Sequence, residues 1–374
     1  MSFSQQFHII TLPPLFIGTL FFIIGIIWHT STTILLIIFC ISLCNLLFAY
    51  KQQRQLPKQL LLCSFFAFTG AYLHQKELRD YNDFYTFINT SAVTINGLVI
   101  DKNIVIMNHK KTIALTLTIN KITNKDSSYT SNKVLMIYMP DKKECTITVG
   151  DTVSLYNIFC KKPSNQSFQR YQIKEQIAST IFENNPHYTI DNHPNYSIRR
   201  WIWNQKQRLL DGLSTKLSSH GFRFFSSLFL GNRSCIKESL EATNEQFKTW
   251  GISHFLARSG LHLALFIFIW QAIFCMIPLP FIYKQLTISL LSCIYFILTW
   301  TSAPFTRSFA LFILNKFCLF TKRPFHLLHY LTVVAFGFLL YCPLYLFFLD
   351  FQLSFALTCA LAWFNQLSLQ HQSK

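Results

Sequence analysis

The chain has 374 residues, of which 51% are hydrophobic, 16% are aromatic and only 13% are charged. A soluble domain carries about 25% charged residues, and 39 Phe side chains are more apolar surface than one soluble core of this size can hide. The composition therefore excludes a simple soluble protein and indicates a membrane protein. The formal net charge of +17 favours contact with anionic lipid or with a polyanion such as nucleic acid.

The amino-terminal part predicts a group of membrane helices. Ile9–Trp28 and Thr32–Tyr50 are apolar runs without a charge, each close to the ~20 residues that cross a bilayer, and Leu60–Leu73 is a shorter third run. Basic residues between the second and third runs place that loop in the cytoplasm. We expect residues 1–74 to form about three membrane helices, of which the first is an anchor and not a cleaved signal.

Residues 75–190 predict a soluble β-rich domain. Val93–Ile100, Ile113–Ile119 and Val134–Met139 are rich in β-branched residues, which favour strands. Cys145–Phe159 predicts a hairpin around the turn signal Val149-Gly150-Asp151. Several short strands suit a small barrel or sandwich, and the loop charges place this domain outside the cytoplasm.

Most of the 11 cysteines fall in apolar runs, where they act as small hydrophobic residues. Only Cys145 and Cys160 belong to the β-rich segment, where an oxidising compartment would allow a disulfide. Because distance cannot be read from sequence, a disulfide and two free thiols stay equally open. The absence of a C-x-x-C pair gives no indication of a zinc ribbon.

Residues 191–250 predict an amphipathic interfacial helix and a linker. In Ile198–Ser219 the leucines recur at helical spacing and basic residues occupy other positions. Trp201 and Trp203 fit the aromatic belt at a lipid boundary. Residues 251–374 then carry about five apolar segments of membrane-helix character: Ser253–Met276, Leu286–Trp300, Phe305–Phe320, Leu327–Phe348 and Phe351–Leu367.

Ionisable side chains inside these segments need a reason to be there, because an unpaired charge in a bilayer costs several kcal/mol. His254, Arg258 and His262 are spaced four residues apart, so they form a polar stripe on one helix face. Ser259-Gly260 interrupts the same segment and predicts a kink or a close helix contact. Arg307 and Asp350 lie near span ends, where snorkelling to water and a role in a pore are equally open.

Four stretches resemble, in content and order, the hallmark segments of the ComEC family of bacterial competence channels. They are Leu230–Ser234, Trp250–Leu263 with its Ser-Gly-Leu-His core, Ala303–Ser308 and Phe351–Ala356. Arg258, Asn232 and Asp350 depart from the residues usual in that family. The resemblance implies the amino-terminal portion of such a protein, without the metallo-β-lactamase-like domain that many members append.

The fold class that the resemblance and the composition together predict is a polytopic α-helical membrane protein with an inserted extracytoplasmic, OB-like β domain. The resemblance implies a multi-pass protein of the bacterial inner membrane that passes single-stranded DNA. Its partners would be DNA, lipid, a DNA receptor, a cytoplasmic motor ATPase and a separately supplied nuclease, with a homo-oligomer left open. No cofactor is expected. The residues expected along the DNA path in the membrane are His254, Ser259, Gly260, His262, Arg307 and Gln352.

The β-rich domain offers residues for holding a single strand by phosphate neutralisation and base stacking. The residues expected to bind DNA there are Lys110, Lys111, Lys161, Lys162, Phe168, Arg170 and Tyr171. An ordinary solvated basic surface is the competing interpretation, because acidic residues are interspersed.

Two other functions compete with a DNA channel. A membrane-embedded hydrolase would use His254 and His262 as metal ligands or as acid and base, but no carboxylate or thiolate partner lies in the same segment, and the sequence predicts no metal site. A shortened relative would act as a scaffold, or would be a remnant that transports nothing. No nucleotide-binding loop of the G-x-x-x-x-G-K-[ST] type occurs in the sequence.

Overall fold

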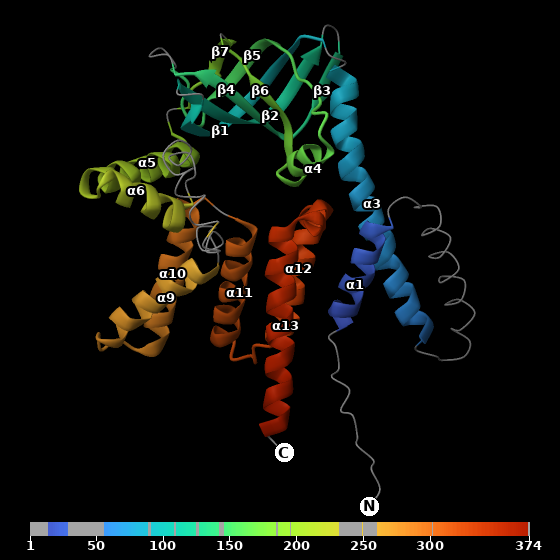
Figure 1. Cartoon of the computed structure of the whole chain (residues 1–374), viewed down its shortest axis with the longest axis vertical. Coiled ribbons are helices and arrows are strands. Elements are labelled where there is room, and N and C mark those ends of the chain that lie inside the picture. The colour runs from blue at the N-terminus through green and yellow to red at the C-terminus, as the bar shows by residue number, and fades with distance from the viewer. Residues whose placement is uncertain are drawn as a thin grey trace, which may run out of the picture. The chain divides into compact units, whose positions relative to one another are not determined.

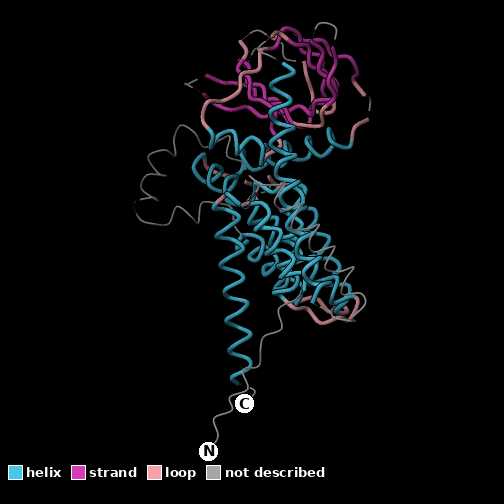
Figure 2. Tube along the Cα trace, turned by 90° about the vertical axis from the view of Figure 1, so that its right-hand side faces the viewer, coloured by secondary structure: helices cyan, strands magenta, loops and turns pink. Residues whose placement is uncertain are grey.

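The computed structural model describes residues 14–28, 56–88, 91–107, 110–124, 127–141, 146–184, 186–194, 196–231, 249, 260–300 and 302–372. The second predicted membrane run, Thr32–Tyr50, lies outside the described residues. The chain divides into two compact units, one of residues 1–79 and 318–374 and the other of residues 80–317. The described part is mostly helical and contains one β-sheet domain (Figures 1 and 2).

The first unit is built from apolar helices: α1 (Pro14–Ile27), most of α3 (Leu56–Ile88), α12 (Leu327–Tyr341), the short 3-10 turn η4 (Pro343–Phe347) and α13 (Leu349–Gln372). Aromatic rings hold it together, because Phe336 of α12 packs edge-on against Phe22 of α1 at 5.3 Å and against Phe66 of α3 at 5.4 Å. Cys342 and Pro343 end α12, so the predicted single segment Leu327–Phe348 is two elements.

Among the described residues, α10 (Phe281–Leu298) is the helix that is long and apolar enough to cross a membrane. Four shorter apolar helices accompany it, at Leu15–Ile27, Gly260–Cys275, Leu327–Tyr341 and Leu349–Phe364. This is compatible with a membrane protein, since α10 buries little of its apolar surface within the chain.

The third predicted run is part of a longer helix than the sequence suggested. α3 continues past Leu73 without a break to Ile88, a total of 33 residues. Its last turns carry Tyr81, Phe84 and Ile88, which are all buried, and Phe84 and Ile88 belong to the core of the β domain. The start of the β domain is therefore helical, and its first strand begins at Val93.

The β domain is one mixed sheet whose strands curl around, as Figure 2 shows, and its interior is apolar. Its strand order is β6-β4-β2-β1-β5-β7, with β3 paired to β2; β4 and β6 run parallel and the other pairs are antiparallel. The strands are β1 (Val93–Met107), β2 (Lys110–Asn124), β3 (Ser127–Thr130), β4 (Val134–Pro140), β5 (Thr152–Ile158), β6 (Ile177–Phe182) and β7 (His187–Asn192).

Alternating burial explains why the strand predictions succeed. In β4 every second side chain is buried, as period-2 patterning requires for a sheet with one covered face. β1 and β2 extend beyond the predicted runs to 15 residues each, and register shifts at Asn96/Gly97 and Val99/Asp101 allow such a long ribbon to bend.

The predicted hairpin over Cys145–Phe159 is wrong. Residues 146–148 form no strand, and β5 pairs with β1 and β7. The turn at Val149-Gly150 closes against β1 instead, because Gly150 N donates to Val99 O at 2.9 Å and Val99 N donates to Asp151 O at 2.9 Å.

Helices complete the second unit. The β domain carries α4 (Gln166–Lys174), and beyond it come α5 (Ile198–Lys216), α6 (Ser219–Phe225), the π-helical turn η3 (Ser226–Leu230), α9 (Gly260–Cys275), α10 and α11 (Ala303–Phe320). Stacked rings join α10 to α11, with Phe296 lying 4.1 Å from Phe309, and α9 to α10, with Phe266 lying 4.4 Å from Tyr295.

Candidate functional site

The start of α9 and the start of α11 meet at Gly260. A Cβ at this position would lie 2.0 Å from Ser308 Oγ and 2.9 Å from Ser308 Cβ, closer than any side chain tolerates. Arg307 Nη2 would lie 3.9 Å from the same point. The Ser-Gly-Leu-His stretch and the Ala303–Ser308 stretch, which lie far apart in the sequence, are therefore packed together through a position where only glycine fits.

His262 lies two residues further along α9 and is buried. Its ring contacts Phe229 of η3 edge-on, with the centroids 5.8 Å apart and an interplanar angle of 89°. This places a polar imidazole inside a largely apolar helix group, a position that marks candidate functional residues.

η3 is held against the end of α10 by hydrogen bonds to its backbone carbonyls. Gly231 ends η3 in the left-handed conformation, with φ of 76°, and its N–H donates to Ser226 O. Trp300 N donates to Leu230 O at 2.8 Å, and Tyr295 OH donates to Phe229 O at 2.7 Å. Because π-helical turns are rare and occur often at functional sites, the Leu230-Gly231 motif is a positioned part of this site.

The structure brings together three of the residues predicted to lie along the DNA path: Gly260, His262 and Arg307. The other three are either outside the described residues or in the other compact unit. His254 and Ser259 lie outside the described residues. Gln352 lies on α13 in the other compact unit, where it is exposed and its Nε2 donates to Leu346 O at 2.7 Å. Asp350 occupies the first turn of α13 and accepts from Phe351 N at 3.0 Å, a position where a helix favours negative charge.

The predicted DNA-binding residues of the β domain fall into two groups. One group surrounds α4: Phe168 and Tyr171 stack on each other at 6.1 Å and are 41% and 43% exposed, and Lys161 and Arg170 beside them are exposed. The other group is Lys110 and Lys111, at the start of β2. The pairing register separates Lys111 from the α4 end of β4 by about 20 Å.

Lys162 has a structural partner that the sequence did not suggest. Its Nζ donates to Asn82 Oδ1 on α3 at 2.7 Å and lies 6.0 Å from the centre of the Tyr81 ring. Tyr81 OH in turn donates to Gln172 Oε1 of α4 at 2.7 Å. Lys162 therefore helps to fasten the end of α3 to the loop before α4, which limits its freedom to meet a ligand.

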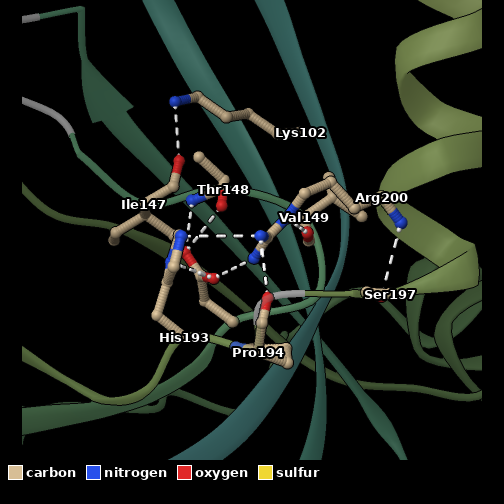
Figure 3. Close-up of polar contacts among 9 residues, drawn as sticks. Lys102, Ile147, Thr148, Val149, His193, Pro194, Ser197 and Arg200 are labelled. Atoms are coloured by element: carbon tan, nitrogen blue, oxygen red, sulfur yellow. Dashed lines mark hydrogen bonds and ion pairs between the residues drawn. The ribbon is translucent and has the colours of Figure 1, made fainter.

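A polar socket fastens α5 to the β domain, and Figure 3 shows its residues. Arg200 of α5 donates to Val149 O at 3.0 Å, to Pro194 O at 3.0 Å and to the fully buried carboxylate of Asp151 at 2.6 Å. His193 Nδ1 also lies 2.8 Å from Asp151 Oδ1, and the second carboxylate oxygen accepts from Thr148 N and Oγ1.

Position 150, beside this socket, accepts only glycine. Its φ is +94°, and a Cβ there would lie 2.6 Å from Ser197 Oγ, the side chain that caps α5 by accepting from Arg200 N. The turn signal read in the sequence thus serves to seat a helix.

The tryptophans of α5 have different surroundings. Trp201 is 55% exposed, as a lipid-boundary residue would be. Trp203 packs against the β-domain core, and its Nε1 donates to Lys102 O at 3.1 Å, so its position differs from the aromatic-belt prediction. Lys206 lies over the ring of Trp300 at 5.1 Å, which links α5 to the end of α10.

Cys160 is a buried, free thiol, and burial raises its pKa to about 12. Cys145 lies outside the described residues; of the two alternatives that the sequence left open, the structure has Cys160 as a free thiol. Within the described ranges, no group of three or more His, Cys, Asp and Glu side chains is placed to hold a metal ion.

Comparison with known families agrees with the position of this site. Residues 228–374 match the family model described as Competence protein, a stretch that contains Gly231, Gly260, His262, Arg307 and Gln352. No curated protein matches the chain, and no solved structure matches it.

Proposed function

We propose that this chain is a component of the path by which single-stranded DNA crosses the inner membrane of a bacterium during natural transformation. The observation that carries the proposal is the packing of Gly260 against Ser308 and Arg307, beside His262 and its contact with Phe229; these residues all belong to the stretch that matches the competence family. A phosphate backbone cannot cross hydrocarbon unaided. A buried imidazole and a guanidinium between apolar helices offer the polar surface that it needs.

The topology of the β domain supports a role in receiving the strand. An order of β6-β4-β2-β1-β5 with β4 parallel to β6 is the order of a five-stranded OB-type barrel, to which β7 and β3 are added. In that fold, oligonucleotides bind across the second and third strands and the two loops that connect strands one to two and four to five.

Both groups of predicted contact residues lie at those two connections. Lys110 and Lys111 follow the β1–β2 connection, and the segment between β5 and β6 carries Lys161, Phe168, Arg170 and Tyr171. The length of β4 between the Lys111 end and the α4 end, about 20 Å, suits a strand of several nucleotides, as OB-type sites hold about 4–16. Stacking on Tyr171 and Phe168 would be independent of base sequence.

In this proposal the protein is multi-pass, the β domain is extracytoplasmic and α5 lies at the lipid boundary. The loop charges support this arrangement, as does the exposed Trp201 of a helix that contacts the end of α10. A DNA receptor, a motor ATPase and a nuclease would be separate proteins, and more than one copy of the chain could form the path. His262 and Arg307 would line the route through the helices of their unit, and Gln352 is a separate candidate on α13.

Uptake of radiolabelled DNA into cells tests the proposal. Cells that lack the gene are complemented with the wild-type chain, with Arg307→Leu or with Arg323→Leu, an exposed cation in the loop after α11. We expect the gene deletion and Arg307→Leu to abolish uptake into the protected, intracellular fraction, and Arg323→Leu to preserve it when membrane levels are equal. Unchanged uptake after the gene is deleted would refute the proposed function.

A further inference from the structure

The sequence that follows Glu245 has an unusual charge balance. From Gln246 to Leu349 the chain contains no Asp and no Glu, yet it contains seven basic residues: Lys248, Arg258, Lys284, Arg307, Lys316, Lys322 and Arg323. Cations on membrane helices are ordinarily neutralised by carboxylates of neighbouring helices. This stretch supplies none, so a cation held between its helices, unlike one in an exposed loop or at a helix start, suits an anion that comes from elsewhere.

Lys316 is a cation of this set for which the sequence predicts no role. It lies on α11, nine residues and about 14 Å along the helix axis from Arg307. Its ammonium donates a hydrogen bond to Gln285 Oε1 of α10, and among the described residues it has no ion pair.

The direction of the Lys316 side chain argues against simple snorkelling. α11 ends four residues later, at Phe320, so a side chain reaching for water would extend toward that end. The ammonium instead lies 5.2 Å from the ring centre of Phe312, one turn earlier in the helix. It is turned inward, between the aromatic face of α11 and the first turns of α10.

An amide and an aromatic ring orient this ammonium but cannot neutralise its charge. Gln285 offers one acceptor oxygen to a group that has three donors, and Phe312 offers a weak electrostatic contact. The remaining donors and the full positive charge are available to an anion. Within the proposed DNA path, the anion of matching chemistry is a phosphodiester group.

We infer that Lys316, oriented by Gln285, is a second phosphate-binding position on the DNA path, about 14 Å further along α11 than Arg307. This inference rests on the proposed function and extends it to a pair of residues outside the competence motifs. The strand would exchange contact with one cation for contact with the next, which is easier than leaving a single tight site.

Uptake of labelled DNA by the full-length chain in cells tests this position. Lys316→Gln removes the charge, and we expect it to slow uptake about tenfold, the loss of one charged contact. Lys316→Arg keeps the charge and should stay within about twofold. Lys284→Gln, a cation one residue from Gln285 whose side chain makes no hydrogen bond or ion pair among the described residues, is the matched control and should behave as wild type.

A second variant tests the position without removing the lysine. Gln285→Glu places a carboxylate beside the ammonium, so the pair should fold while its charge is cancelled. We expect uptake to fall by about the same factor as with Lys316→Gln, since the phosphate would lose its partner. Membrane levels of every variant are measured by immunoblot so that uptake is expressed per molecule.

Several outcomes would overturn the inference. Normal uptake per molecule with Lys316→Gln or Gln285→Glu would do so, as would an equal loss with Lys284→Gln or an equal loss with Lys316→Arg. If Lys316→Gln lowers only the amount of protein in the membrane, the lysine contacts lipid headgroups instead. Loss of uptake with Arg307→Leu but not with Lys316→Gln rejects this position alone, whereas uptake independent of the gene rejects both proposals.

Discussion

At position 260 the space between α9 and α11 holds a hydrogen atom and nothing larger. Gly260→Ala should therefore push the two helices apart and reduce both DNA uptake and the thermal stability of the purified protein, with a cost of about 1–3 kcal/mol for overpacking. Gly337→Ala on α12 is the control, because a Cβ there meets nothing within 4 Å, and alanine in a helix should be neutral or slightly stabilising.

Ser308, which faces Gly260, provides a test of whether a steric clash causes the effect of Gly260→Ala. Ser308→Gly removes the atoms that a Cβ at position 260 would strike, so it should rescue Gly260→Ala. A double variant no better than Gly260→Ala alone would show that the loss has another cause. The sequence predicts a close helix contact at Ser259-Gly260, but it does not identify Ser308 as the partner, because the two residues lie on separate helices.

Cys160 should make the stability of the β domain depend on pH. Its folded pKa of about 12 lies above its ordinary value of 9.0 because burial disfavours the thiolate. The unfolded state therefore loses this proton first, so this thiol's contribution to stability is complete below pH 9 and is lost as the pH rises toward 12. Denaturant unfolding from pH 8 to 11 should show the decline. Cys160→Ala should delay its onset to about pH 10, where the buried Tyr81 and the half-buried Tyr85, whose pKa values are also raised, begin to contribute.

An onset that does not move in Cys160→Ala would mean that the thiol is not what couples stability to pH. A thiol in this environment should also resist alkylation at pH 8 until the domain unfolds. Rapid modification of Cys160 in the folded protein would contradict its burial.

Among the elements, α5 depends on one buried charge pair. Arg200→Met leaves the Asp151 carboxylate buried without its guanidinium partner, so we expect a loss of about 3–5 kcal/mol in the unfolding free energy of the β domain. Arg199→Met, an exposed neighbour on the same helix, should change it by less than about 0.5 kcal/mol. Equal effects of the two substitutions would contradict the socket.

Element α4 should provide much of the affinity for single strands. Tyr171→Ala removes an exposed ring beside Lys161 and Arg170, and we expect a loss of about 1–3 kcal/mol in binding free energy. Fluorescence anisotropy with a labelled oligonucleotide at fixed salt measures it, because affinity falls with salt. Tyr196→Ala, at a 77% exposed ring outside the proposed binding surface, should bind as wild type; a loss as large as that of Tyr171→Ala would remove α4 from the proposal.

Local pattern explains most of what the sequence predicts about the elements. The alternation in Val134–Met139 and the helical spacing in Ile198–Ser219 depend on neighbours along the chain, and both elements form. The hairpin at Gly150 fails because that turn bonds to β1, some 50 residues away. The roles of Trp203 and Lys162 also depend on distant partners, Lys102 and Asn82, which no local pattern specifies.

On the scale of the whole molecule, the described structure combines three kinds of surface that a DNA path needs. The β domain has the strand order β6-β4-β2-β1-β5-β7, which the proposal interprets as an oligonucleotide-binding barrel. A helix with an exposed tryptophan joins it to α10, and α10 and α11 carry cations without carboxylates. Composition alone predicts the membrane class. The arrangement of the site depends on contacts between α9, α11 and η3 that only the folded chain displays.

Crosslinking to DNA in transit tests the central claim most directly. A photoreactive residue is placed at Leu311, one turn beyond Arg307 on α11, and separately at Phe268 of α9, which is 66% exposed. Cells are given DNA whose trailing end carries a bulky protein, so that the strand stalls while it crosses. We predict that the stalled strand crosslinks at position 311 and not at 268; uptake that proceeds without any crosslink at 311, or with equal crosslinking at both positions, would contradict a DNA path along α11.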